Sequence, residues 1–132
     1  MKIEHIGIAV SDMEQAVKTY EQLLQTPCYK KEQVASEGVE TAFFQLADSK
    51  IELLEAMNED SPIAKFILKK GEGIHHIAFE VEDIEAEMKR LSALGFQVLN
   101  EQPKRGADNE LVCFLHPKSA HGVLVELCQE IK

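Results

Sequence analysis

The chain has 132 residues, of which 45% are hydrophobic and 28% charged, and its formal net charge is −9. This length is typical of one globular domain, and the composition is not that of a disordered protein. The excess of 23 acidic over 14 basic residues disfavours nucleic acids and anionic membrane surfaces as partners, because both repel a negative protein. No apolar run approaches the roughly 20 residues of a membrane span, and the N-terminus shows no secretory cleavage region.

The three cysteines, Cys28, Cys113 and Cys128, are widely spaced and contain no CxxC pair. This odd number predicts neither a disulfide framework nor a thiolate zinc site. Cys113 and Cys128 lie in apolar runs, where we interpret them as small buried residues. We therefore expect a reduced, cytoplasmic protein.

The first half of the chain predicts one strand, one helix and three further strands. Residues 2–10 are β-branched and apolar, as in a strand. Ser11 and Glu14 then form a Ser-x-x-Glu capping box that predicts the start of a helix. The helix carries apolar residues at helical spacing, namely Met13, Ala16, Val17, Tyr20, Leu23 and Leu24. Short strands are expected at about 30–34, 39–46 and 51–56.

A link over about 58–72 joins this half to the next, and Ser61-Pro62 predicts a short helix over about 62–70. The second half repeats the order of the first. A strand is expected over 74–81, followed by a helix that Gly95 ends. The apolar stripe of this helix consists of Ile84, Met88, Leu91 and Leu94, and strands are expected at 96–99, 111–116 and 123–128.

The two halves are also related in sequence. IEHIGIAVSDME (3–14) aligns without gaps on IHHIAFEVEDIE (74–85), with six identities in twelve positions. KIELLEA (50–56) resembles VLVELCQ (123–129) more loosely. We expect an α+β fold of two βαβββ modules, about 1–57 and 73–132, within one domain that spans residues 1–132. One module alone is marginal, so pairing of the two is expected to bury their inner faces.

Four polar residues fall at matching places in this repeat. His5 and His76 are equivalent in the first strands, and Glu52 and Glu126 in the last strands. A single strand histidine is usually a hydrogen-bonded structural residue, and a single strand glutamate usually faces solvent. The shared register favours a metal site instead, because a carboxylate in an apolar strand needs a cation or a proton. Two imidazoles and two carboxylates suit a divalent Co, Mn, Ni, Zn or Fe ion without choosing among them.

Other polar residues are less informative. His75 is expected to face away from His76, because adjacent strand residues point to opposite faces. His116 is a candidate ligand contact, whereas His121 is interpreted as an ordinary loop residue. The basic residues Lys104, Arg105 and Lys118 either bind phosphate or carboxylate groups or lie on a solvated surface.

The arrangement of two βαβββ units with a His/Glu pair in each resembles the vicinal oxygen chelate superfamily, which includes glyoxalase I. The motifs SPIAKF (61–66), GIHHIAFEV (73–81) and FLHPKSAHGVLVEL (114–127) are similar to those of methylmalonyl-CoA epimerases. The resemblance covers essentially the whole chain. It implies curved mixed sheets around one metal-binding cleft, and a homodimer.

The resemblance also implies the chemistry. His5, His76 and Glu126 would be metal ligands, with Glu52 in a fourth position, and methylmalonyl-CoA would be the substrate. Inversion at C2 needs proton exchange on opposite faces, most simply by two acid/base groups. Glu126 is one candidate base, and Glu40 and Glu52 are candidates for the other. Counting from Gly38, the family's base falls instead on Thr41, which faces the opposite way from Glu40.

Two other functions compete with the epimerase. A glyoxalase I-type lactoylglutathione lyase has similar ligands and also moves a proton. A small-molecule-sequestering protein of the same fold would need no metal, and the four-residue set argues against it. Fold alone supports none of these functions.

Overall fold

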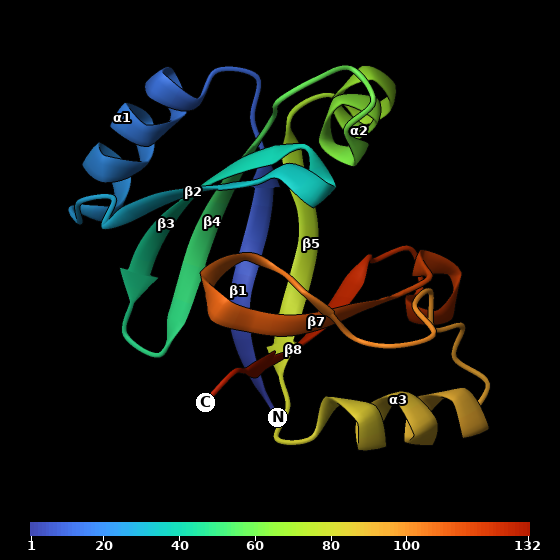
Figure 1. The fold of residues 1–132 in the computed structure, drawn as a ribbon. Helices are drawn as coiled ribbons and strands as arrows, with labels where there is room; N and C mark the ends of the chain where they lie inside the picture. Colours follow the sequence, from blue (N-terminus) through green and yellow to red (C-terminus); the bar gives the residue numbers. More distant parts are fainter. The chain divides into compact units, whose positions relative to one another are not determined.

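The computed structural model describes every residue from 1 to 132, and the chain divides into two compact units. We call His5–His75 the N-terminal unit, and Met1–Glu4 with His76–Lys132 the C-terminal unit. The bounds fall within β1 (Lys2–Ala9) and β5 (Gly73–Glu80), which are described with the N-terminal and the C-terminal unit, respectively. The chain forms three α-helices and eight strands, and Figure 1 draws them as a ribbon. None of the helices is long and apolar enough to cross a membrane.

The N-terminal unit is built on four strands in the order β2-β3-β4-β1. Strand β1 is parallel to β4, and the other neighbours are antiparallel. The elements of this unit are β1 (Lys2–Ala9), α1 (Met13–Leu24), β2 (Lys30–Val34), β3 (Val39–Leu46), β4 (Ser49–Ala56) and α2 (Pro62–Lys70), with a short 3₁₀ turn at Ala35–Glu37.

The two helices of this unit contact different strand residues. The cluster under α1 contains Val10, Met13, Ala42, Phe44 and Leu53. The cluster under α2 contains Ala9, Val39, Leu54 and Ile63. Leu53 and Leu54 are adjacent in β4 and point to opposite faces, so the apolar run of this strand serves both helices.

The C-terminal unit repeats the pattern with strands in the order β5-β8-β7-β6. Strand β5 is parallel to β8, and β7 is antiparallel to both β8 and β6. Its elements are β5 (Gly73–Glu80), α3 (Ile84–Ala93), β6 (Lys104–Arg105), β7 (Glu110–Leu115) and β8 (Val125–Glu130), with 3₁₀ turns at Ala107–Asn109 and Pro117–Ala120.

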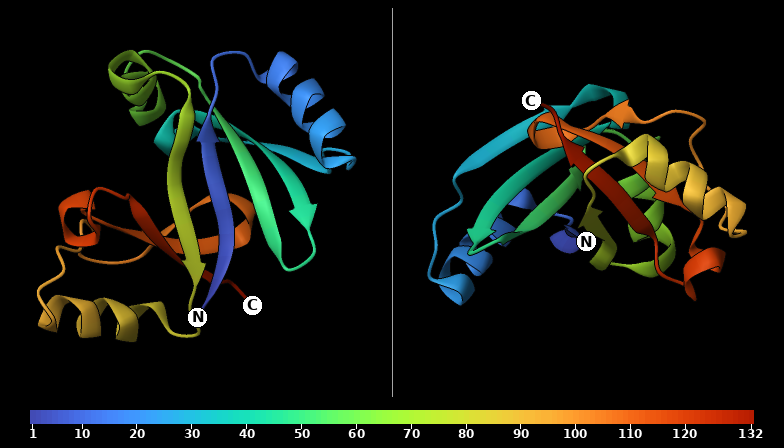
Figure 2. Two further views of the ribbon diagram at one scale, coloured as in Figure 1. Left: turned by 180° about the vertical axis from the view of Figure 1, so that it is seen from behind. Right: turned by 90° about the horizontal axis from the view of Figure 1, so that it is seen from below.

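Helix α3 lies beside β8 in both views of Figure 2 and covers one face of this unit. The residues buried beneath it are Val81, Ile84, Met88, Leu91, Cys113, Leu115 and Leu127. The opposite face carries a small cluster of Ala78, Val112 and Cys128. Leu127 and Cys128 thus point to opposite faces, as adjacent residues of a strand do.

Most predicted elements are confirmed, including the strands at 30–34 and 39–46 and the helix at 62–70. Three details were wrong. The first helix is capped by Asp12, whose side chain accepts from Gln15 N–H, and not by the Ser11–Glu14 box. The expected strand at 96–99 is a single bridge from Val98 to Leu115. The edge strand at Lys104–Arg105 was not predicted.

Candidate functional site

In the N-terminal unit, His5 on β1 lies beside Glu52 on β4. The His5 Nδ1 atom is 3.1 Å from Glu52 Oε2, and both residues are buried. The parallel register sets Gly7 opposite Glu52. Because side chains alternate along a strand, His5 and Glu52 share one face of the sheet.

The C-terminal unit has the same arrangement. His76 on β5 and Glu126 on β8 are buried, and His76 Nε2 lies 3.2 Å from Glu126 Oε1. The register sets Ala78 opposite Glu126, as Gly7 is set opposite Glu52 in the other unit. Each histidine therefore lies beside the glutamate of its own half of the repeat.

A buried imidazole–carboxylate pair has two chemical uses. The pair can share a proton, so the carboxylate is suited to accept a proton from a bound molecule and return it. Its nitrogen and oxygen are also the donor types that bind zinc and other first-row divalent ions. Each unit thus supplies one such pair.

Each carboxylate has a phenylalanine directly across the neighbouring strand. Phe43 is opposite Glu52, and Phe114 is opposite Glu126. The Phe114 ring meets the His76 ring edge-on, with centroids 6.0 Å apart and an interplanar angle of 87°. Phe43 is fully buried, whereas Phe114 keeps part of its surface exposed. Neither phenylalanine was predicted from the sequence, although the two follow the same 71-residue spacing as the histidines.

The strand register separates Glu40 from the His5–Glu52 pair. On β3, Phe43 and Thr41 face the same side as Glu52, because Phe43 is opposite Glu52 and Thr41 is opposite Leu54. Glu40 is opposite Glu55 and therefore points to the other face. Of the two alternatives that the sequence left open on this strand, Thr41, which is buried, shares the face of Glu52, and Glu40 does not.

His75, the neighbour of His76, points away from the pair, as expected. Its ring packs edge-on against Phe66 of α2, with centroids 5.0 Å apart and an interplanar angle of 81°. Alternation along β5 explains why two adjacent histidines have different surroundings.

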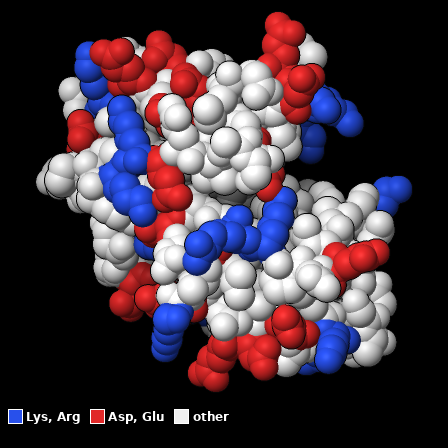
Figure 3. All heavy atoms as spheres, in the orientation of Figure 1, with Lys and Arg blue, Asp and Glu red and all other residues white.

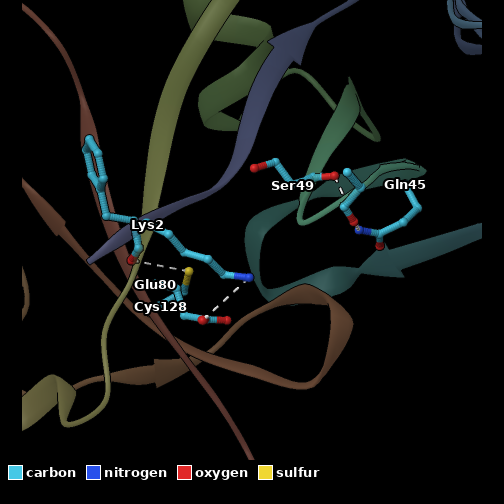
Figure 4. Close-up of polar contacts among 7 residues, drawn as sticks. Lys2, Gln45, Ser49, Glu80 and Cys128 are labelled. Atoms are coloured by element: carbon cyan, nitrogen blue, oxygen red, sulfur yellow. Dashed lines mark hydrogen bonds and ion pairs between the residues drawn. The ribbon is translucent and has the colours of Figure 1, made fainter.

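The buried Cys113 of the C-terminal unit is held as a thiol. Burial, with the nearby Glu126 carboxylate, raises the pKa of Cys113 to about 11. The Cys128 thiol donates to the Phe79 carbonyl oxygen at 3.5 Å, and Figure 4 shows this contact beside the Lys2–Glu80 ion pair. Cys113 therefore stays protonated at neutral pH and is a poor nucleophile or metal ligand.

The candidate substrate-binding residues have mixed surroundings. His116 caps the short turn at Pro117–Ala120, where its Nδ1 accepts from the Lys118 backbone N–H at 3.0 Å. The Lys118 side chain is exposed. Lys104 and Arg105 form the edge strand β6, where Arg105 is exposed. His121 ends the turn in the left-handed conformation, consistent with a loop role.

Comparisons with known proteins agree with this geometry. Residues 4–114 match the model of the Glyoxalase/Bleomycin resistance protein/Dioxygenase superfamily. The chain is 44% identical to the ethylmalonyl-CoA/methylmalonyl-CoA epimerase of Cereibacter sphaeroides, over 97% of each protein. It is 40% identical to the human mitochondrial methylmalonyl-CoA epimerase, over 97% of this chain and 73% of the human protein.

Solved structures give the same result. A variant of the Streptomyces coelicolor methylmalonyl-CoA epimerase, in complex with 2-nitronate-propionyl-CoA, matches with a TM-score of 0.94 and 36% identity. The match covers 100% of this chain and 99% of that chain. The fold is therefore the glyoxalase fold of paired βαβββ modules that the repeat predicted. The chain belongs to the Glyoxalase/Bleomycin resistance protein/Dioxygenase superfamily and, within it, to the methylmalonyl-CoA epimerase family.

Proposed function

We propose that this protein epimerises methylmalonyl-CoA, interconverting the 2R and 2S forms by proton transfer at C2. It is an isomerase that acts on an acyl-CoA thioester. The observation that carries this function is the presence of one buried His–Glu pair at the same place in each half of the repeat. The epimerase relatives, one of them solved with an acyl-CoA analogue, support the same substrate class.

The reaction explains why two carboxylates are needed. Loss of the C2 proton leaves an enolate whose charge develops on the thioester oxygen. Inversion follows when a proton returns to C2 from the opposite face, which requires two acid/base groups. We assign these roles to Glu126 and Glu52. Glu40 is not assigned such a role, because it points to the other face of the strand. Thr41 is not assigned one either, because a threonine hydroxyl is too weak an acid to serve as the acid/base group.

We further propose that the two units form one domain in which His5, Glu52, His76 and Glu126 bind a single divalent metal ion. Two imidazole nitrogens and two carboxylate groups are a donor set that such ions accept, whether Co, Mn, Ni, Zn or Fe. A bound dication would stabilise the negative charge that develops on the thioester oxygen. The two imidazoles would hold the ion. Glu126, and Glu52 when it is not bound to the ion, would exchange the C2 proton.

The coenzyme A part of the substrate is anionic, as is the protein. The face in Figure 3 nevertheless carries lysine and arginine side chains among the acidic ones, so positive charge is locally available. We propose that Lys104, Arg105 and Lys118 bind the phosphates of coenzyme A. The contact between His116 and the Lys118 backbone would hold this turn in place. We also propose a cytoplasmic homodimer.

Hydrogen exchange at C2 tests the proposed reaction. Purified protein is treated with chelator, reloaded with Co or Mn, and incubated with (2S)-methylmalonyl-CoA in heavy water. We expect deuterium at C2 and a mixture of both epimers, measured by mass spectrometry and by a coupled assay for the 2R form. Absence of exchange with every divalent ion, together with turnover of a glutathione hemithioacetal, would instead identify a glyoxalase I-type lyase.

A further inference from the structure

Phe114 lies on the face of the C-terminal unit that carries the His76–Glu126 pair. Its neighbours in β7, Cys113 and Leu115, pack under α3. Phe114 lies between them and therefore projects from the opposite face. The edge-on contact with His76 and the position opposite Glu126 place its ring against both members of the pair.

The equivalent phenylalanine of the other unit has different surroundings. Phe43 is fully buried, with the Tyr29 ring centroid 5.9 Å away and Lys30 Nζ 5.2 Å from its own centroid. Phe114 has no such cover and remains partly exposed. An exposed aromatic surface beside a few buried polar groups is the usual lining of a small-molecule site. Phe114 is therefore the member of this pair that is available to a ligand.

We propose that Phe114 contacts the alkyl branch at C2 of the substrate and sets the size of branch that the enzyme accepts. This inference rests on the proposed epimerase function, in which Glu126 exchanges the C2 proton. The alkyl branch is bonded to the same carbon as that proton. Directly opposite residues of antiparallel strands have Cβ atoms about 4.5–5.5 Å apart. A carbon within reach of Glu126 therefore carries its alkyl branch against the Phe114 ring.

Size-changing substitutions at Phe114 test this role, with Phe43 as the matched control. Phe114→Leu, Phe114→Ala and Phe43→Leu are compared with the wild type on methylmalonyl-CoA and ethylmalonyl-CoA. Both kcat/KM and the dissociation constant from titration calorimetry are measured for each thioester. We expect Phe114→Ala to raise the preference for ethylmalonyl-CoA by roughly 10-fold or more, and Phe114→Leu by less, because one methylene is worth about 10- to 200-fold in a closely fitting pocket.

Phe43→Leu is expected to change both substrates by the same factor, because its ring is enclosed by Tyr29 and Lys30. The proposal would be overturned if neither Phe114 variant changed the preference between the two thioesters. It would also be overturned if Phe43→Leu changed this preference as much as Phe114→Leu does. A wild-type protein that binds both thioesters but epimerises neither would refute the proposed function. In that case the ratio of the dissociation constants for the two thioesters still decides whether Phe114 discriminates between alkyl branches of different size. A wild type that binds neither thioester would overturn both proposals.

Discussion

The N-terminal and C-terminal units are two versions of one βαβββ pattern, and the features they share are those that position polar groups. The His–Glu distances are 3.1 Å in one unit and 3.2 Å in the other. Both main helices begin after an aspartate cap, Asp12 for α1 and Asp83 for α3. The repeat therefore preserves helix starts as well as the candidate site.

A further shared feature links the last strand of each unit to its helix. Glu55 at the end of β4 accepts from the Met13 N–H at 2.8 Å. Gln129 near the end of β8 accepts from the Ile84 N–H at 2.9 Å. These are the first N–H groups of the two helices, which have no partner within a helix. Each last strand thus holds both the site carboxylate and a helix cap.

The units differ in what surrounds the shared features. The edge strands differ in length. Strand β2, which pairs with β3, has five residues, whereas β6, which pairs with β7, has two. The phenylalanine beside the carboxylate is covered in one unit and partly exposed in the other. Two halves with the same polar pair can therefore differ in the exposure of the aromatic side chain beside it, which is buried in the N-terminal unit and accessible in the C-terminal unit.

Removal of one imidazole should have the largest effect. In His76→Ala, we expect loss of divalent metal binding and a fall in activity of about 100- to 1,000-fold or more, as when charge stabilisation at a developing oxyanion is removed. Metal analysis and the deuterium-exchange assay give the two readouts, and circular dichroism checks the fold. The control is His75→Ala, whose side chain packs against Phe66. Equal losses in the two variants would refute the assignment of His76.

Substitution of each carboxylate should block proton exchange on a different face of C2. In Glu52→Gln and in Glu126→Gln, epimerisation should fall by about 100- to 10,000-fold, the usual contribution of one acid/base group. Each variant should still exchange the C2 hydrogen of one epimer, and the two variants should prefer opposite epimers. Bound metal is measured in both, so that loss of the ion is distinguished from loss of the base.

Glu40→Gln is the control for these variants, because Glu40 lies on the other face of β3. It should exchange both epimers at the wild-type rate. If Glu52→Gln also exchanges both epimers normally, then Glu52 is not the second base. A slow Glu40→Gln variant would mean that the carboxylate on the opposite face takes part after all.

Much of the fold could be predicted because its signals are local. The bounds of β2 and β3 and of α2 follow from strand composition and from Ser61-Pro62, and the structure agrees with them. The pairing of His5 with Glu52 and of His76 with Glu126 follows from the repeat, because equivalent strands place equivalent side chains. The element bounds thus depend on a few neighbouring residues, and the equivalent His and Glu positions depend on the comparison of the two halves of the sequence.

The details that could not be predicted are those in which two neighbouring residues have similar local propensities and tertiary contacts determine the outcome. Ser11 and Asp12 are both good caps, and the cap at Asp12 coincides with the hydrogen bond that the Met13 N–H donates to Glu55. Thr41 and Glu40 are adjacent, and only the register with β4 shows which of them faces the side of Glu52. The residues at 96–99 have strand composition, but Val98 finds only a single bridge partner.

The helix caps from the last strands should have a moderate effect on stability. Glu55→Ala is expected to lower the free energy of unfolding by about 1.5–3 kcal/mol, because its acceptor is a charged carboxylate at the positive end of α1. Gln129→Ala should lower it by about 0.5–1.5 kcal/mol, because its acceptor is neutral. Urea unfolding measures both, with the exposed Glu59→Ala as the control. Equal losses would show that charge adds nothing at the α1 cap.

The smallest expected effect concerns the turn before each last strand. Ala47 precedes β4 with φ of 50°, and His121 precedes β8 with φ of 55°. Gln45 donates to the carbonyl oxygens of Ala47 and Ser49, and Figure 4 shows the second of these bonds. Left-handed backbone costs an alanine roughly 1–2 kcal/mol, and glycine removes this cost while adding entropy to the unfolded chain.

We therefore expect Ala47→Gly to raise the free energy of unfolding by about 0.5–1 kcal/mol. His121→Gly should gain less, because histidine adopts this conformation more readily than most side chains. His121→Gly also leaves the His116–Lys118 contact in place, because that contact lies within the preceding turn. Thermal unfolding of the two variants tests the difference. A loss of stability in Ala47→Gly would mean that the bonds from Gln45 already offset the strain in the N-terminal unit.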